Sequence, residues 1–354
     1  MTEKRGIRDI KEQKLEAKRK GRKKRRIVFL VVEILVLLIL LGVAYVRHQY
    51  DKFQIQSFGE GEIQVNEGVE REGYTTLALF GGDSRKGALE KGTHSDTIII
   101  VSIHNKTKEI KMVSIYRDTL TEQMNGTLRK ANNAYFVGGP KEAINMLNKN
   151  FDLDIQGYVT VDFSALAYAV DLVGGVEIEV SDAEATQINK YIGETAKIIG
   201  KEANKVSAGK QNLDGVQAVT YSRIRKNVGG DYQRTDRQRE VLMAFANKAK
   251  KASLPTLNKI INEVFPRIST SLKLSELLKM ATGVTKYNLG ESKGFPFEKA
   301  DGRTQAAGSV IVPLGLVENV QELHAFLYAD EEYEASETVK TIAITIENET
   351  GYKR

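Results

Sequence analysis

The chain has 354 residues, no cysteine and a formal net charge of +6 at pH 7. The lack of cysteine excludes disulfide bonds and thiolate chemistry, and it is typical of a bacterial envelope protein rather than a secreted animal domain. Residues 1–26 contain 13 Lys or Arg and 4 Asp or Glu, a balance of +9. Since Glu33 is the one charge in 27–46, residues 47–354 carry −2. The basic character therefore belongs to a short stub, which argues against nucleic-acid binding.

An apolar segment follows the stub. Residues 27–46 include one ionisable group, Glu33. A helix of this length spans about 30 Å, the thickness of the hydrocarbon core of a bilayer. Residues 22–26 are all Lys or Arg, which the positive-inside rule places in the cytoplasm. We expect an uncleaved transmembrane signal anchor, with the N-terminus cytoplasmic and the rest of the chain extracellular. Signal-peptidase cleavage near Gly42 and Ala44 is the alternative.

The remainder of the chain divides into a linker, a large domain and a tail. Residues 47–73 are polar and rich in Gly and Glu, as linkers are, whereas β-rich runs and helical patterns interleave over 74–330. We predict strands at 75–80, 97–103, 109–115, 155–161, 176–180 and 309–312, and helices at 140–150, 163–172, 213–222, 235–251, 272–282 and 316–327. This order predicts an α/β fold, an αβα sandwich with a mixed central sheet. Residues 181–212 are predicted as a polar surface excursion, and the tail, 331–354, as one strand at 339–346.

Three charged stretches, 80–97, 114–119 and 221–242, fall where an α/β sheet places its sites, at strand ends and helix starts. Arg223 and Arg225 are two residues apart, so they point the same way if that segment is extended. Arg234 and Gln238 share one face of a predicted helix, which Thr235 or Asp236 would cap. Arginines at a helix start are suited to bind phosphate.

Carboxylates accompany these arginines. Asp83 and Asp96 offer the oxygen ligands that Mg²⁺ or Mn²⁺ takes when it shares a site with phosphate. Pyrophosphate chemistry uses this combination of metal and arginine. For each residue alone, a solvated charge or an Asp–Arg salt bridge is the alternative.

The order of short motifs resembles the LytR-CpsA-Psr family. The motifs are GGDSR at 81–85, SDT at 95–97, SIYRD at 114–118, KANNAY at 130–135, LDGVQAVTYSRIR at 213–225 and RTDRQ at 234–238. The resemblance implies a Mg-dependent extracytoplasmic phosphotransferase that moves a cell-wall glycopolymer from a polyprenyl-pyrophosphate carrier to peptidoglycan. The polymer would be teichoic acid, capsule or another wall polysaccharide of a Gram-positive envelope.

The resemblance also implies residue roles. It implies a catalytic pyrophosphate clamp of Arg85, Arg117, Arg223, Arg225 and Arg234. It implies substrate binding by Lys130, Asn132, Arg237 and Gln238, and metal binding by Asp83 and Asp96.

Two positions depart from the family pattern. Tyr116 replaces the usual Pro, which we expect to loosen the bend that aims Arg117, and His94 stands where Arg often precedes SDT. A polyprenyl tail would also need an apolar slot. Candidate side chains on one helical face are Phe163, Leu166, Ala167 and Val170, and the helical segment Ile144–Leu147 is a second candidate. Plain core packing is the alternative for both.

Other functions are compatible with parts of the pattern. A pyrophosphatase acting on the lipid carrier would use the same clamp with water as acceptor. The family was historically described as transcriptional attenuators, but a 26-residue stub has no room for a helix-turn-helix. A wall-binding scaffold would not need two metal-binding carboxylates. The four histidines are scattered through the sequence, which argues against a hydrolase triad or a His-rich metal site.

Overall fold

The computed structural model describes Glu33 and residues 35–69, 71–82, 89 and 91–344. They belong to two compact units, one ending at Asp51 and one starting at Lys52. In the first unit, Glu33 and residues 35–50 are helical, and the large apolar side chains from Leu35 to Tyr45 are each at least 50% exposed. Within the described residues, no helix meets both the length and the apolarity needed to cross a membrane. Residues 27–32 and 34 of the expected anchor lie outside the described residues.

The second unit is built on a seven-stranded mixed sheet. Its strand order is β1–β10–β7–β2–β3–β4–β11, and both parallel and antiparallel neighbours occur. The strands are β1 (Gln54–Ile55), β2 (Tyr74–Gly82), β3 (Ser95–His104), β4 (Glu109–Ile115), β7 (Gly157–Asp162), β10 (Ile268–Thr270) and β11 (Asn288–Phe295). The predicted α/β fold with a mixed sheet is confirmed, and the predicted strands 97–103 and 109–115 pair antiparallel as β3 and β4.

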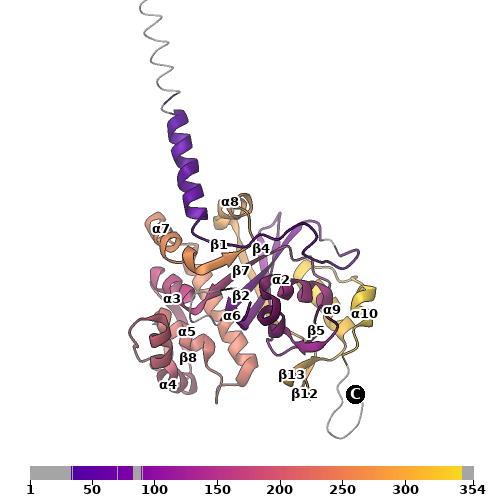
Figure 1. Ribbon diagram of the computed structural model, residues 1–354. Coiled ribbons are helices and arrows are strands. Elements are labelled where there is room, and N and C mark those ends of the chain that lie inside the picture. The colour runs from indigo at the N-terminus through magenta and orange to yellow at the C-terminus, as the bar shows by residue number, and fades with distance from the viewer. Residues whose placement is uncertain (1–32, 34, 70, 83–88, 90, 345–354) are drawn as a thin grey trace, which may run out of the picture. The chain divides into compact units, whose positions relative to one another are not determined.

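One face of this sheet is covered by α2 (Ala131–Phe151), α9 (Leu316–Tyr328) and α10 (Glu337–Thr341). Alternate residues of a strand point to opposite faces, so Ala78 and Phe80 of β2 enter the core under these helices with Ile98 and Ile100 of β3. Figure 1 shows α2, α9 and α10 together on one side of the sheet. The apolar alternation that predicts the strands therefore also builds this core.

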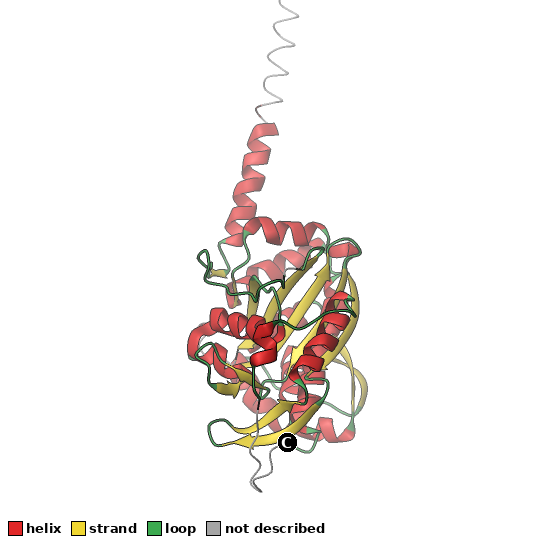
Figure 2. Ribbon diagram, turned by 90° about the vertical axis from the view of Figure 1, so that its right-hand side faces the viewer, coloured by secondary structure: helices red, strands yellow, loops and turns green. Residues whose placement is uncertain are grey.

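The opposite face carries α3 (Phe163–Leu172), α5 (Gly215–Arg223), α6 (Gly230–Ala249) and α7 (Leu254–Glu263). Beside them lies α4 (Asp182–Ile199) with the small sheet of β8 (Val176–Val180) and β9 (Gly209–Leu213). Helices thus flank the strands on both sides, as Figure 2 shows. The remaining elements are α8 (Leu274–Thr282), two short 3-10 helices (Phe265–Arg267 and Val284–Lys286), and the hairpins β5 (Leu120–Glu122)–β6 (Leu128–Lys130) and β12 (Lys299–Thr304)–β13 (Gly308–Pro313).

Segment 181–212 differs from its prediction as a surface excursion. It contains α4, and its N-terminus is closed by a capping box between Ser181 and Glu184. Ile188 and Ile192 are buried at helical spacing among charged residues. The segment is polar in overall composition, but α4 is an amphipathic helix whose narrow apolar stripe packs onto α5.

Both ends of the large domain also differ from their predictions. Residues 52–73, predicted as linker, belong to the folded unit, because β1 pairs with β10. In the tail, residues 337–341 form α10 instead of a strand. Its cap residue Ser336 donates hydrogen bonds from its N–H and its Oγ to the buried carboxylate of Asp152, at 2.7 and 2.6 Å. The Oγ of Ser336 also accepts a hydrogen bond from the N–H of Val339 at 3.3 Å, and this capping, together with the burial of Val339, favours a helix over the β-branched pattern of the sequence.

Candidate active site

Several strand ends meet at one edge of the sheet. Gly82, the last residue of β2, pairs with Ser95 at the start of β3 and with Asp162 at the end of β7. The end of β4 lies beside the start of β3. The predicted metal ligand Asp83 and the predicted clamp residue Arg85 follow Gly82 directly and lie outside the described residues.

Glycine at position 81 allows two of these strands to approach closely. Gly81 pairs directly with Thr97 of β3. A Cβ atom on Gly81 would lie only 2.8 Å from both Cβ and Oγ1 of Thr97, which is inside van der Waals contact. The missing side chain therefore allows β2 and β3 to approach closely next to Asp96, which precedes Thr97 in β3.

Five charged residues from distant parts of the chain form the core of the site. We call Asp96, Arg117, Arg225, Asp231 and Arg234 the arginine cluster. Arg117 pairs with Asp96, and Asp231 pairs with both Arg225 and Arg234. The two groups are coupled: burial lowers the pKa of Arg234, the charges of Asp231 and Asp96 raise it, and those of Arg225 and Arg117 lower it. The structure therefore brings together three of the five predicted clamp arginines.

Arg234 is the most buried member of the cluster, with 3% of its surface exposed. Its Nη2 lies 2.7 Å from Oδ1 of Asp231, yet within the described residues neither Nη2 nor Nε donates a hydrogen bond. The same holds for Nε of Arg117. Buried N–H groups without an acceptor are costly. Anionic oxygens would supply the missing acceptors, and guanidinium groups bind phosphate oxygens with matching geometry.

The helix that carries Arg234 begins earlier than predicted. Its N-cap is Gly229, and Gly229 and Gly230 have φ values of 90° and 72°, in the left-handed region that glycine adopts without strain. Neither Thr235 nor Asp236 is the cap. The two glycines turn the chain back so that Asp231, in the first turn of α6, meets Arg225.

Arg223 and Arg225 also differ from the prediction that they point the same way. Arg223 ends α5, whereas Arg225 follows the extended residue Ile224. The guanidinium of Arg223 lies 4.5 Å from the centre of the Phe163 ring, and its Nη1 donates a hydrogen bond to Oγ1 of Thr195 at 3.4 Å. Arg223 is therefore held beside α3 and α4, apart from the ion pairs of the cluster.

The predicted substrate-binding residues take different places. Nζ of Lys130 lies 3.0 Å from Oδ1 of Asp118, and the backbone N–H of Asn132 donates to the carbonyl oxygen of Arg117 at 3.1 Å. Both residues thus support the turn that presents Arg117. The buried guanidinium of Arg237 donates to the carbonyl oxygens of Ile224 and Val228 and contacts Glu184 at 3.2 Å. Arg237 therefore holds the α5–α6 loop.

Gln238 lines a small cavity between the sheet and helices α3 and α6. The cavity has a volume of about 70 Å³ and a mostly apolar lining that includes Leu79, Ile99, Phe163, Leu166 and Leu242. Phe163 and Leu166 were predicted as sides of an apolar slot, and they border this cavity. Ala167 and Val170 instead lie in the core that α3 shares with α5.

Tyr116 does not leave its bend loose. Its N–H, which a proline would lack, donates to the carbonyl oxygen of Phe295 at 3.0 Å, and its carbonyl accepts from the N–H of Thr119 at 2.9 Å. Its ring packs edge-on against Tyr232 with centroids 4.9 Å apart. Backbone hydrogen bonds and ring packing therefore replace the constraint of a proline. The other departure, His94, stacks on Phe136 at 4.4 Å.

Sequence reasoning assigned no role to Asp231 or Asp118. Asp231 connects Arg225 to Arg234, and Asp118 contacts Lys130 at 3.0 Å and Nε of Arg117 at 3.5 Å. The spacing of Asp231 and Arg234, three residues apart on one helix, was the available signal. It was missed because the helix was predicted to start after both residues.

The fold and the motif order agree with a known family. The LytR_cpsA_psr family model matches residues 44–311. The chain belongs to this family. It is 29% identical over 236 residues to the polyisoprenyl-teichoic acid–peptidoglycan teichoic acid transferase TagV of Bacillus subtilis, covering 65% of this chain but only 58% of that protein. It is 28% identical over 284 residues to TagU of Oceanobacillus iheyensis, a transferase of the same description, covering 75% of this chain and 83% of that protein.

Solved structures of LytR-CpsA-Psr proteins share the fold. TagT bound to LIIa-WTA superimposes with a TM-score of 0.62 at 24% identity, over 78% of this chain and all of that one. The crystal structure of Bacillus subtilis TagV gives a TM-score of 0.57 at 23% identity, over 75% of this chain and all of that one. At this level of identity the likeness concerns the fold alone.

Proposed function

We propose that this LytR-CpsA-Psr protein transfers a glycopolymer of the teichoic acid class from a polyisoprenyl diphosphate carrier to peptidoglycan. The names of TagV and TagU describe this activity for relatives that align with most of the chain. The arginine cluster supplies the chemistry that a diphosphate substrate requires. The observation that carries the proposal is the buried guanidinium of Arg234, with donors that lack acceptors in the described part of the chain.

The transfer itself is a phosphoryl substitution. A hydroxyl oxygen of peptidoglycan forms a bond to the phosphorus next to the glycopolymer, and the bond from that phosphorus to the bridging oxygen breaks. Polyisoprenyl monophosphate leaves, the glycopolymer remains attached through a phosphodiester, and the hydroxyl proton passes to a base. Negative charge grows on the bridging oxygen, and Arg117, Arg225 and Arg234 would stabilise it.

We further propose that Asp96 shares a Mg²⁺ or Mn²⁺ ion with the diphosphate. One oxygen of Asp96 pairs with Arg117, while its second oxygen accepts no hydrogen bond from the described part of the chain, and the side chain is 23% exposed. A carboxylate in this state fits a hard cation that keeps further oxygen ligands from substrate. The described residues contain no group of three or more potential ligands, and Asp83 lies outside them. A bound cation would neutralise diphosphate oxygens.

The proposed topology is an N-terminal membrane anchor with the domain on the outer face of the cell membrane. It is supported by the +9 stub and the apolar run 27–46. The exposure of the apolar side chains between Leu35 and Tyr45 also agrees with a lipid environment. The apolar cavity beside Phe163, Leu166 and Gln238 is the proposed entrance for the polyisoprenyl chain.

A product analysis tests the proposed function. The full chain in detergent is incubated with a polyisoprenyl-diphosphate-linked teichoic acid precursor and peptidoglycan, and the products are identified by mass spectrometry. A phosphodiester between glycopolymer and peptidoglycan, formed together with polyisoprenyl monophosphate, is the expected result. Release of free phosphorylated glycopolymer without attachment would instead identify a pyrophosphatase and refute the transferase proposal.

A further inference from the structure

The chain enters the folded unit next to α7. Lys52 hydrogen-bonds to Asn262, the Phe53 ring stacks on Phe265 with centroids 4.1 Å apart, and the Gln54 side chain donates to the carbonyl oxygen of Pro266 at 3.1 Å. Four peptide steps separate Tyr50, the last helical residue of the first unit, from Gln54, and they span at most about 14 Å. The chain therefore joins the folded unit at its α7 end.

This end of the domain is basic. Residues 250–287, which include α7, β10 and α8, contain seven Lys or Arg and two Glu, a balance of +5. Residues 52–354 carry −2 in total, since Arg47 and Asp51 cancel. The rest of the folded unit therefore carries −7. The positive charge is concentrated where the chain enters the unit, and such asymmetry indicates an anionic partner.

Apolar side chains accompany these charges at the surface. Helix α7 has no buried residue, and Leu254 at its start is 81% exposed. Leu278 of α8 is 44% exposed, and Lys259, Lys273 and Lys286 are exposed beside these helices. Leucine and lysine together on short amphipathic helices are the composition of segments that lie in a membrane interface. We call the exposed side chains of residues 250–287 the α7–α8 face.

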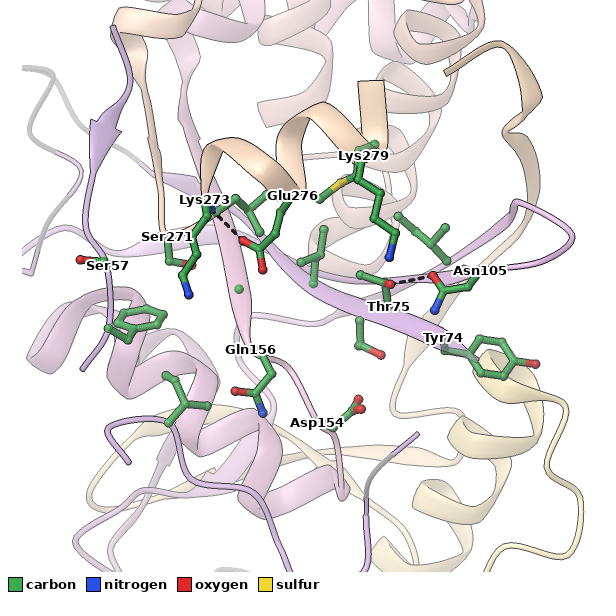
Figure 3. A pocket seen from close by; sticks show the side chains of 18 of the residues that line it. Ser57, Tyr74, Thr75, Asn105, Asp154, Gln156, Ser271, Lys273, Glu276 and Lys279 are labelled. Atoms are coloured by element: carbon green, nitrogen blue, oxygen red, sulfur yellow. Dashed lines mark hydrogen bonds between the residues drawn. The ribbon is translucent and has the colours of Figure 1, made fainter. Parts of the chain in front are cut away.

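A large cavity opens beside α8. It has a volume of about 600 Å³, and Lys273, Lys279 and Met280 of this segment line it together with Phe58 and Tyr74. Figure 3 shows Lys273 and Lys279 on the same side of this space, with Asp154 and Gln156 across from them. The face is therefore hollowed, with room for a polar headgroup next to two ammonium groups. Glu276 is turned back to the backbone N–H of Lys273, at 2.7 Å.

We propose that the α7–α8 face docks on an anionic phospholipid bilayer, an inference that rests on the proposed membrane anchor. Leucines of α7 and α8 enter the interface, and the surrounding lysines bind headgroup phosphates. The arginine cluster and the cavity beside α8 lie at opposite ends of β2, which runs through nine residues from Tyr74 at the cavity to Gly82, a length of about 27 Å. The segment after α7 enters β10 nearer the Gly81 end, because Ile268 pairs with Val161 and Val161 pairs with Gly81. Docking therefore holds the transfer site at a fixed height above the membrane.

Site-specific fluorescence in the full chain tests this arrangement, because the protein has no cysteine of its own. Single cysteines replace Leu254 on the α7–α8 face, Gln305 in the exposed β12–β13 turn, and Leu38 in the N-terminal helix. Figure 1 shows β12 and β13 at the end of the folded unit away from α7 and α8. Each variant is labelled with an environment-sensitive dye and reconstituted in phosphatidylcholine vesicles with and without phosphatidylglycerol. Nitroxide-labelled lipid is the quencher.

The label at 254 should be quenched in vesicles that contain phosphatidylglycerol and much less in neutral vesicles, while the label at 305 stays unquenched in both. Replacing Lys259, Lys273 and Lys286 by Gln should reduce the quenching at 254, because each lysine contributes about fivefold to partitioning. A control with the same charge change, Lys190, Lys197 and Lys205 to Gln on and after α4, should leave it unchanged.

Three results would overturn the docking proposal. The first is equal quenching at 254 and 305, and the second is quenching at 254 that changes with neither lipid charge nor the three lysine substitutions. The third is quenching that depends on the protein-to-lipid ratio, which would assign the face to a second copy of the chain. The label at 38 separates this failure from failure of the anchor. Quenching at 38 without quenching at 254 would refute the docking proposal alone, whereas no quenching at 38 would refute the proposed membrane anchor.

Discussion

Oδ1 of Asp231 lies 2.7 Å from Nη2 of Arg234, three residues further along the same helix. The same carboxylate pairs with Arg225 across the α5–α6 loop. Burial alone would raise the pKa of Asp231, but its hydrogen bond with Arg225 and the charges of Arg234, Arg225 and Arg117 lower it. Asp231 therefore orients Arg225 and Arg234, two of the proposed clamp arginines, relative to each other.

Replacing Asp231 by Asn should destabilise the fold by about 1 to 2 kcal/mol at pH 7, because two arginines then lose a partly buried counter-charge. A carboxylate with a lowered pKa stabilises the fold above its unfolded pKa, about 3.9, and the stabilisation is lost as pH falls through the folded value. The difference from wild type should thus be full at pH 7 and shrink below about pH 4. Thermal unfolding across this range measures it.

Asp236 provides the control for that measurement. It lies on the same helix and pairs with Arg239, but its side chain is 56% exposed. Asp236→Asn should therefore change stability by less than about 0.5 kcal/mol. Equal effects of the two substitutions would show that the ion pairs of Asp231 with Arg225 and Arg234 contribute no more to stability than an exposed pair.

His324 should make the fold sensitive to mild acid. Its Nε2 contacts the carbonyl oxygen of Phe151 at 3.0 Å and its Nδ1 contacts the guanidinium of Arg71 at 2.9 Å, so the neutral ring donates through Nε2 and accepts through Nδ1. Burial lowers its pKa from 6.5 to about 4. The neutral ring therefore contributes full stability above pH 6.5, and protonation of the unfolded state removes about 2 kcal/mol between pH 7 and pH 5.

The test compares unfolding of wild type and His324→Gln at pH 7 and pH 5. Glutamine keeps one donor and one acceptor but does not titrate. The variant should lose the part of the pH dependence that belongs to His324, while its stability at pH 7 falls modestly. An unchanged pH dependence in the variant would contradict the assignment.

Gly81→Ala should damage both the fold and the transfer activity. The added Cβ would lie 2.8 Å from Cβ and Oγ1 of Thr97, so the two strands must separate next to Asp96. Overpacking of this kind costs about 1 to 3 kcal/mol. Removing the opposing side chain, in Gly81→Ala with Thr97→Gly, should recover part of the lost melting temperature and activity. A single Gly81→Ala variant with wild-type stability and turnover would show that the strands do not need this close approach.

Much of the fold could be predicted because apolar alternation and helical periodicity decide it locally. Strands β2, β3 and β4 and helices α3 and α9 lie within one or two residues of their predicted ranges. Helix α4 was missed because its apolar residues are interspersed with charged and polar ones. Helix α10 was missed because it has one apolar residue, Val339, and depends on its cap and on packing against residues distant in sequence. β1 has only two residues, and it is a strand because it pairs with β10 at the edge of the sheet.

The site was predictable in composition but less so in geometry. Arg117, Arg225 and Arg234 do come together, yet Arg223 is drawn to Phe163 and Arg237 to the carbonyl oxygens of the α5–α6 loop. Sequence spacing cannot distinguish a guanidinium that faces the site from one that satisfies backbone oxygens, because the two differ in their three-dimensional surroundings and not in their position along the chain. The positive φ values of Gly229 and Gly230 set where α6 starts, and that start brings Asp231 to Arg225.

The metal proposal makes a separate prediction. A chelator and Asp96→Ala should each abolish transfer, with no further loss when they are combined, because both remove the same cation from the diphosphate. The melting temperature should change little. If Asp96 serves only as the partner of Arg117, Asp96→Ala would instead destabilise the fold, and full transfer in chelator would return Asp96 to a structural role.

The most direct test of the account is the rate of glycopolymer transfer to peptidoglycan by Arg234→Lys. Lysine keeps the positive charge but cannot present the planar fork that binds two phosphate oxygens. We predict a loss of about 100-fold in transfer rate with a nearly unchanged melting temperature, and Arg117→Lys should behave alike. The control Arg239→Lys changes a buried arginine of the same helix that pairs with Asp236, and it should transfer at close to the wild-type rate. A folded Arg234→Lys protein that transfers as fast as wild type would contradict the proposal that the arginine cluster binds the diphosphate.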